Sequence, residues 1–198
     1  MKYDIRKLTL AADTLIPQLK SQRHRAILQN YRKHAMLEVS GRFSEIFTPE
    51  LCTDNPSYRV AMAGNFLELN GKSEIRDFYG SLLDTESTVM MLEGEKIAVA
   101  DWGFASEAIY HTFMPGRTAV MRGNEVGDLD AIYIESRWIS VVWSYDERCR
   151  MIGEHVYLAP KATAIRPCPP DEMLTLEEVR AIFDPLIASA IIELPETA

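Results

Sequence analysis

The sequence has 198 residues, of which 47% are hydrophobic and 25% are charged, so it suits one folded domain with extensions and excludes a disordered chain. The formal net charge of -8 argues against nucleic acid or an anionic membrane as a partner, because phosphate binding requires a basic face. Three cysteines without CxxC spacing argue against a disulfide framework and a structural zinc site. The longest apolar runs are too short to span a membrane, and the polar N-terminus lacks a signal-peptide pattern, so we expect a cytoplasmic protein.

The first predicted elements are an N-terminal arm over residues 1–20 and one long helix from Ser21 to about Phe47, which contains no internal proline. Within this helix a tyrosine, a histidine and a glutamate recur at spacings of three and four and therefore share one face with an apolar residue. Such a face indicates that the helix partly lines a cavity. The residues of this face are Ile27, Tyr31, His34 and Glu38.

The next segment predicts short elements separated by turns. Thr48-Pro49-Glu50 is typical of a helix start, and Asp54-Asn55-Pro56 is typical of a turn. A short strand is expected over residues 58–62. Ser73 can cap a helix over residues 74–83, whose apolar side includes Tyr79.

The following part of the chain is rich in β-branched and aromatic residues. Strands are expected over residues 95–114, 131–145 and 151–158, and the last two would form an antiparallel hairpin through residues 146–149. Helices followed by strands favour an α+β fold, in which the helices cover one side of an antiparallel sheet. We therefore expect one domain over residues 21–160.

Residues 161–198 are expected to form a C-terminal extension. A proline-rich stretch leads to a final helix that Thr175 and Glu178 begin as a capping box and that Asp184-Pro185 interrupts. This extension is expected to cover a sheet edge, a pocket mouth or a subunit interface.

His34 has the most suggestive context for acid–base chemistry, because histidine titrates near neutral pH and Tyr31 and Glu38 each lie one helical turn away. The same spacing fits a hydrogen-bonded core histidine. His34 and Glu38 also have the spacing of two metal ligands, but no HExxH motif or histidine-rich run supports a metal, and we predict none. No P-loop, dinucleotide-binding glycine pattern or GxSxG motif is present, so a nucleotide cofactor or a covalent serine mechanism lacks support.

Two charged residues lie in segments that otherwise predict buried strands. Asp101 stands beside Trp102, and Arg137 stands beside Trp138. An isolated buried charge is costly, so these two residues either pair structurally across the sheet or serve a function. Aromatic side chains that line one cavity would suit an aromatic or alicyclic ligand.

Four segments resemble SnoaL-like members of the NTF2-like superfamily, and together they span about residues 20–160. The first helix of that superfamily is similar to residues 24–42, and its "G-x-x-x-I-x-x-F-Y" helix is similar to residues 70–79. Two strand segments are similar as well. They are Ile97-Ala98-Val99-Ala100-Asp101-Trp102-Gly103-Phe104 and Gly153-Glu154-His155-Val156-Tyr157.

The resemblance implies a cone-shaped α+β barrel, in which a strongly curved antiparallel sheet and N-terminal helices enclose a deep pocket. Members of the superfamily include cofactor-free polyketide cyclases, ketosteroid isomerase, scytalone dehydratase and lyases that release formaldehyde from lignin-derived diaryl compounds. Others bind ligands without catalysis, so the fold alone does not determine the function. The superfamily commonly forms dimers through the sheet, which implies a homodimer or a higher homo-oligomer.

Scytalone dehydratase suggests which residues would act, because tyrosines and an Asp–His arrangement line its cone. A similar set would come from two parts of this sequence. The helix and the segment after it would supply Tyr31, His34 and Tyr58, and the strands would supply His111 and His155. This sequence departs from that pattern at Arg32, where the dehydratase has an aspartate, so Asp101 would have to supply the carboxylate. Ketosteroid isomerase needs an aspartate base and an oxyanion hole formed by a tyrosine and an acid, and this sequence does not place these three groups together.

We therefore expect a cofactor-independent lyase of aromatic-compound catabolism, which dehydrates a small aromatic compound or releases a small aldehyde such as formaldehyde from it. In this hypothesis His34 is the general acid or base, Tyr31 and Tyr58 donate hydrogen bonds, and Arg137 stabilises the developing anion. Asp101 would orient His111 or Arg137. An isomerase or cyclase would use the same residues, whereas a non-catalytic binding or dimerisation module would bury them with structural partners. The residues expected to contact the substrate are Glu38, Tyr79, Trp102, Trp138 and His155.

Overall fold

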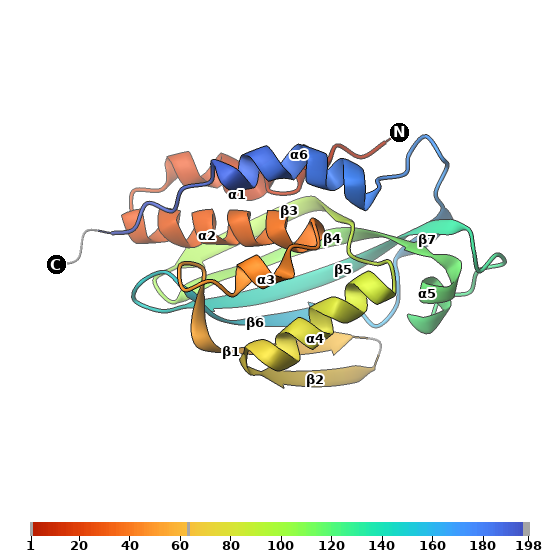
Figure 1. Ribbon diagram of the computed structural model, residues 1–198, viewed down its shortest axis with the longest axis horizontal. Helices are drawn as coiled ribbons and strands as arrows, with labels where there is room; N and C mark the ends of the chain where they lie inside the picture. Colours follow the sequence, from red (N-terminus) through yellow and green to blue (C-terminus); the bar gives the residue numbers. More distant parts are fainter. Residues whose placement is uncertain (1, 63, 196–198) are drawn as a thin grey trace.

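The computed structural model describes residues 2–62 and 64–195. Helices α1, α2 and α6 lie together above a curved sheet, and α4 crosses beside β1 and β2 (Figure 1). Helices preceding and flanking a sheet confirm the expected α+β class. In chain order the elements are the 3-10 helix η1 (Ile5–Lys7), α1 (Leu10–Leu15), the 3-10 helix η2 (Ile16–Gln18), α2 (Gln22–Val39), α3 (Phe43–Ile46), β1 (Cys52–Met62), β2 (Asn65–Asn70), α4 (Gly71–Asp84), β3 (Met90–Ala100), β4 (Gly103–Pro115), α5 (Gly116–Met121), β5 (Ile132–Tyr145), β6 (Met151–Leu158), β7 (Ala164–Pro167) and α6 (Leu176–Ala188).

The sheet has the strand order β2-β1-β6-β5-β4-β3, and β7 pairs with β5 beside the end of β6. All neighbouring pairs are antiparallel except β1 and β6, which are parallel. The sheet was expected to be antiparallel, and the pair of β1 and β6 corrects this expectation. Because α4, α5 and β2 to β5 lie between these two strands in the sequence, the chain has room to return and run in the same direction. Side chains alternate between an inner face under α2 and α4 and an outer face.

Helix α2 ends at Val39, and the prediction of one helix continuing to about Phe47 is wrong. Ser21 caps its start by accepting a hydrogen bond from the His24 N–H. At its end Gly41 has a φ of +65°, a conformation that glycine adopts without strain. The chain therefore turns at Gly41, and only the short α3 follows.

Three smaller predictions about the first half of the chain also need correction. Thr48–Glu50 forms a turn before β1, and Leu51 donates its N–H to the Thr48 carbonyl at 3.1 Å. Residues 54–56 lie inside β1, at a shift in its register with β6 where Pro56 is accommodated. Helix α4 begins at Gly71 after Asn70, and Ser73 lies within it.

Residues 95–114 form parts of two strands, which corrects the single strand predicted there. β3 ends at Ala100, Asp101 and Trp102 form the turn, and β4 begins at Gly103. Gly103 has a φ of +146°, and a Cβ atom there would lie 1.9 Å from the Trp143 carbonyl oxygen, so only glycine fits. Near the C-terminus the capping box of Thr175 and Glu178 is confirmed, but α6 continues through Pro185.

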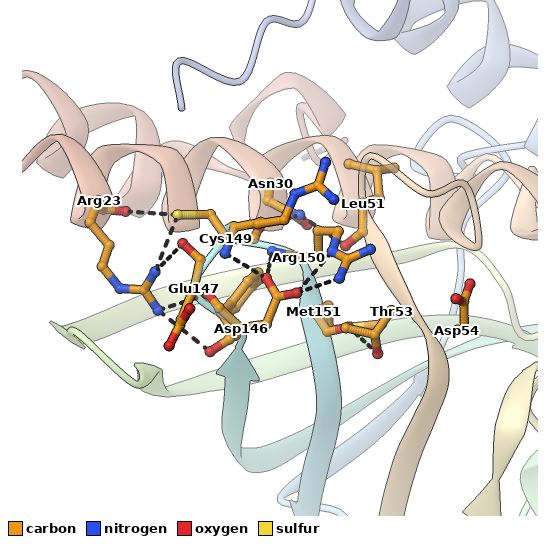
Figure 2. Close-up of polar contacts among 12 residues, drawn as sticks. Arg23, Asn30, Leu51, Thr53, Asp54, Asp146, Glu147, Cys149, Arg150 and Met151 are labelled. Carbon is orange, nitrogen blue, oxygen red and sulfur yellow. Dashed lines mark hydrogen bonds and ion pairs between the residues drawn. The ribbon is translucent and has the colours of Figure 1, made fainter. Parts of the chain in front are cut away.

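The loop between β5 and β6 is fixed against α2 (Figure 2). The Arg23 guanidinium donates to the carbonyl oxygens of Asp146 and Glu147 at 2.9 and 3.0 Å. The fully buried Asn30 donates its Nδ2 hydrogens to the carbonyls of Leu51 and Cys149 at 2.9 and 3.0 Å. Asn30 thereby joins the start of β1 to the loop before β6, the two strands that form the parallel pair.

We expect Asn30→Ala to lower the free energy of unfolding by about 1–3 kcal/mol, because the Cys149 carbonyl would lose the Asn30 donor, while the Leu51 carbonyl would keep the Met151 N–H. Urea denaturation followed by circular dichroism measures this loss. Asn65→Ala, at an exposed position of β2, is the matched control and should change the stability by less than about 0.5 kcal/mol. Equal effects of the two substitutions would contradict this role of Asn30.

Candidate functional site

A cavity lies between α2, α4 and the inner face of the sheet, and it encloses about 890 Å³ of empty space when the solvent at its mouth is included. Its wall is mainly apolar, with Val60, Met90 and Leu92 among the strand residues. Several polar side chains interrupt this wall. They are Tyr31, Glu38, Tyr58, Tyr79, Ser87, Tyr110, Thr112, Arg122 and Glu154.

Two of these polar groups are carboxyls in nearly dry surroundings. Glu38 comes from the last turns of α2, and its side chain keeps 19% of its exposure. Glu154 comes from β6 and is buried. It shares the inner face of this strand with Val156 and Leu158, because every second side chain points the same way. Burial raises the pKa of Glu38 to about 7. Burial first, and then repulsion from the charge of Glu38, raises the pKa of Glu154 well above its ordinary value.

Two tyrosine hydroxyl groups lie beside Glu154. The Tyr58 and Tyr79 hydroxyls lie 3.2 Å apart, and both form hydrogen bonds to Glu154 that partly offset the rise of its pKa. Because Tyr79 comes from α4 and Tyr58 from β1, the network ties the helix layer to the sheet. It presents phenolic donors beside the carboxyl group of Glu154.

His34 stands behind this network and does not line the cavity. Its side chain is fully buried, its Nε2 lies 3.0 Å from the Tyr79 hydroxyl and 3.7 Å from Glu38 Oε2, and its ring packs edge-on against Trp143. Burial lowers the pKa of His34 to about 3, so the imidazole is neutral at physiological pH. The geometry suits a group that orients Tyr79 better than one that exchanges protons with a ligand.

A second tyrosine–carboxyl pair begins at the same wall, where Tyr31 lines the cavity. The Tyr31 hydroxyl donates to Glu95 Oε1 at 2.8 Å. Glu95 follows Gly94, where a register shift between β3 and β4 brings an extra residue into the strand. Burial raises the pKa of Glu95, while the hydrogen bond from Tyr31 lowers it.

A charged cluster closes the cavity at α5. The buried Glu135 on β5 accepts hydrogen bonds from Arg137 at 2.6 Å and Asn124 at 2.7 Å, and it forms an ion pair with Arg122 at 2.7 Å. Burial acts to raise the pKa of Glu135, but Arg137, Arg122 and Asn124 together hold it below its ordinary value. Arg137 also donates to the carbonyls of Ala159 and Pro160. Protein groups therefore satisfy the Arg137 guanidinium. Its ion-pair partner is Glu135, and not Asp101 as considered from the sequence.

Of the residues that the sequence proposed for the site, the structure brings four to the cavity wall: Tyr31, Glu38, Tyr58 and Tyr79. Asp101 instead lies in the β3–β4 turn, where its side chain is 86% exposed and contacts His24 Nε2 at 2.9 Å. Trp102 is the other residue of this turn and is also exposed. Both were expected inside a strand, and the turn between β3 and β4 places them at the surface instead.

Three further candidates project from the outer face of the sheet. His111 is buried there against Ser136 and Glu93, with contacts of 2.8 and 2.7 Å, and it stacks on Tyr3. Trp138 is exposed, and His155 lies opposite Arg59 in the β1–β6 pairing. The outward position of each side chain follows from strand alternation, because the residues before and after it face the cavity or the interior. These residues therefore do not meet Tyr31, Tyr58 and Tyr79.

Sequence reasoning missed Glu154, Tyr110, Glu95 and Arg122. The signal for Glu154 was available, since a glutamate two and four residues before Val156 and Leu158 shares their inward face. Tyr110 belongs to the same alternation as Thr112. The position of Glu95 depends on the register shift at Gly94, and the position of Arg122 depends on the path of α5. The local sequence pattern indicates neither.

No family model and no curated protein matches the sequence. Solved structures do match the fold. A protein from Shewanella putrefaciens CN-32 assigned as a SnoaL-like polyketide cyclase has a TM-score of 0.54 and 12% identity, over 80% of this chain and 90% of that one. An NTF2-like protein from Anabaena variabilis ATCC 29413 has a TM-score of 0.51 and 10% identity, over 71% and 92% of the two chains.

A third similar structure is SalBIII, an epoxide hydrolase/cyclase-like enzyme with a role in pyran ring formation in the polyether salinomycin. Its TM-score is 0.50 and its identity 12%, over 74% of this chain and 99% of that one. At these identities the likeness concerns the path of the backbone and leaves the chemistry of each site to its own residues. The chain therefore has the NTF2-like fold, the fold of SnoaL-like proteins that the sequence segments resembled.

Proposed function

We propose that the cavity is the active site of a cofactor-independent acid–base enzyme that acts on a small aromatic or alicyclic compound. The observation that carries this proposal is the carboxyl pair of the largely buried Glu38 and the buried Glu154, which line a mainly apolar cavity together with tyrosine hydroxyls. Two carboxyls whose surroundings push their pKa values apart can serve as base and acid at one pH. The apolar wall suits a carbocyclic ligand.

The two roles follow from the order of the two pKa values. Glu38, with a pKa of about 7, is the group that ionises first and is therefore the general base. Glu154 stays protonated to higher pH and is the general acid. The tyrosine hydroxyls of Tyr58 and Tyr110 would donate hydrogen bonds to an enolate or phenolate as its charge develops.

Dehydration is the first candidate reaction. Glu38 removes a proton from the carbon next to a carbonyl, and the electron pair of that C–H bond forms a C=C bond. The adjacent C–O bond breaks, and the leaving hydroxyl takes the proton of Glu154 and departs as water. A proton transferred from Glu38 to Glu154, directly or through the tyrosine hydroxyls, restores the starting state. Loss of a small aldehyde by a retro-aldol step would begin with proton removal from a hydroxyl group.

An isomerase or cyclase is the second candidate, and the cyclase names of two similar structures favour it. Glu38 would remove a proton from one carbon and return it to another, so no leaving group would be needed. A non-catalytic binding module would use the same apolar wall, but it gives no reason for two carboxyls to be buried together, because an unpaired buried carboxyl destabilises the fold. Chromatography coupled to mass spectrometry separates the three, because loss of water or aldehyde changes the mass, an isomer changes only the retention time, and a binding module leaves the compound unaltered.

The pH dependence of turnover tests the proposal. Activity should rise as the pH increases through about 7, because Glu38 acts as the carboxylate, and it should fall at higher pH, where Glu154 loses its proton. We would screen hydroxylated aromatic and alicyclic carbonyl compounds for loss of water, release of aldehyde or isomerisation, and measure kcat/KM from about pH 5 to 10. An acid limb at or below about pH 5, where an ordinary glutamate titrates, would contradict the assignment.

A further inference from the structure

We propose that Arg122 is the anion-recognising group of the cavity and that the ligand carries a carboxylate at the end remote from Glu154. This inference rests on the proposed function, because it names the class of compound that the same cavity accepts. It begins from the position of Arg122, which follows α5 and reaches the cavity wall with 21% of its side chain exposed.

The charges around Arg122 do not cancel. Glu135 is the carboxylate that pairs with Arg122, and it also pairs with Arg137. Within the part of the chain that the structure describes, no other carboxylate lies within ion-pair distance of either arginine. Two guanidinium groups thus share one carboxylate, and the cluster keeps a formal charge of about +1.

The surplus charge belongs to the cavity side of the cluster. Arg137 is 3% exposed and donates to Glu135 and to the carbonyls of Ala159 and Pro160, so protein groups surround it. Arg122 makes its ion pair with Glu135 and still lines the cavity. A guanidinium has five N–H donors, and one carboxylate oxygen leaves several for a ligand.

The wall beside Arg122 is suited to a carboxylate. Thr112 lines the cavity in the row of Glu135, and its hydroxyl can donate to a ligand oxygen, whereas the Ser87 hydroxyl is already bonded to Thr85 at 2.9 Å. Among the described lining residues Arg122 is the one cationic side chain. One guanidinium with the Thr112 hydroxyl matches the single charge of a carboxylate, whereas a phosphate dianion would retain an unbalanced charge in an apolar cavity.

The sheet register places Arg122 and Glu154 toward opposite ends of the cavity. Glu154 pairs with Trp143 of β5, whereas Arg122 contacts Glu135, eight residues earlier in the same strand. Eight residues correspond to about 26 Å of strand contour. Glu135 lies in one row with Thr112 and Met90, which also line the cavity. A ligand that reaches both ends must therefore be elongated, with its carboxylate at Arg122 and its carbocyclic part extending toward Glu38 and Glu154.

Calorimetric titration with matched ligands tests this inference. We would titrate the protein with benzoate, cinnamate and 4-phenylbutanoate and with their primary amides, which keep the shape but lack the charge. Wild type should bind at least one carboxylate about tenfold or more tightly than its amide, and Arg122→Gln should abolish the preference. Arg122→Lys should keep part of it, since the charge remains without the planar fork of donors.

The control is Arg59→Gln on the outer face of the sheet, where Arg59 pairs with Glu68, and it should leave the preference unchanged. Thermal unfolding verifies that each variant folds. Equal binding of acids and amides by wild type, or a preference that survives Arg122→Gln, would overturn the inference while leaving the acid–base proposal standing. A preference that depends on Arg122 without turnover that depends on Glu38 would support the inference and refute the proposed function. Binding of neither series would overturn the inference, and the dependence of turnover on Glu38 would still decide the proposed function separately.

Discussion

Glu154→Gln should lower kcat by about 10²–10⁴-fold at the pH optimum, which is the range that a general acid contributes. The amide has the shape of the protonated carboxyl and can still hydrogen-bond to Tyr58 and Tyr79, but it cannot deliver a proton. Since Glu154 acts on the leaving group as its bond breaks, KM should change little. Steady-state kinetics on the compound with the highest turnover in the screen measures both quantities.

The companion variant Glu38→Gln removes the base and should lose a comparable factor, together with the acid limb of the pH profile near 7. The double variant should be scarcely slower than either single one, because a base without its acid partner completes no cycle. Glu107→Gln, at an exposed site on β4, is the matched control for the change from carboxylate to amide. Full activity in Glu154→Gln would eliminate it as the acid, and a loss shared by Glu107→Gln would show a general effect of charge.

His34 marks the limit of what the sequence could establish about the site. Its spacing from Tyr31 and Glu38 correctly placed the three on neighbouring positions of one helix, but spacing does not reveal which of them faces solvent-accessible space. Buried residues of α2 lie both before and after His34, among them Tyr31 and Ala35. The ring of Trp143, from a strand more than 100 residues later, covers His34 and leaves Glu38 facing the cavity.

The elements themselves were largely predictable, since the strands over residues 131–145 and 151–158 and the capping box of α6 follow local patterns. The division of residues 95–114 was not, because Asp101 and Trp102 lie between residues with strong strand preference and Gly103 was the sole sign of a turn. That one error moved Asp101 and Trp102 from the expected site to the surface. The parallel pairing of β1 with β6 depends on contacts between distant segments, which no local pattern contains.

The second large effect is expected at Glu135, where substitution should affect stability. Glu135→Gln should lower the free energy of unfolding by about 3–5 kcal/mol, because it leaves the buried Arg137 without a compensating negative charge. Arg137 cannot turn to solvent, since the carbonyls of Ala159 and Pro160 hold its guanidinium. Urea denaturation near neutral pH measures the loss, with Glu107→Gln expected to stay within about 0.5 kcal/mol of wild type.

A double variant separates the cost of an unpaired charge from that of lost packing. Glu135→Leu combined with Arg137→Met removes both charges and should recover part of the stability lost in Glu135→Gln, as apolar replacement of whole buried ion pairs often does. No recovery would mean that the shape of these side chains, and not their charge, stabilises the end of the cavity. The result also bears on Arg122, because Arg122→Gln leaves Glu135 paired with Arg137 and Asn124 and should therefore destabilise less than Glu135→Gln. If Arg122→Gln proves the more destabilising, Arg122 is held chiefly for stability, and its charge is not available to a ligand.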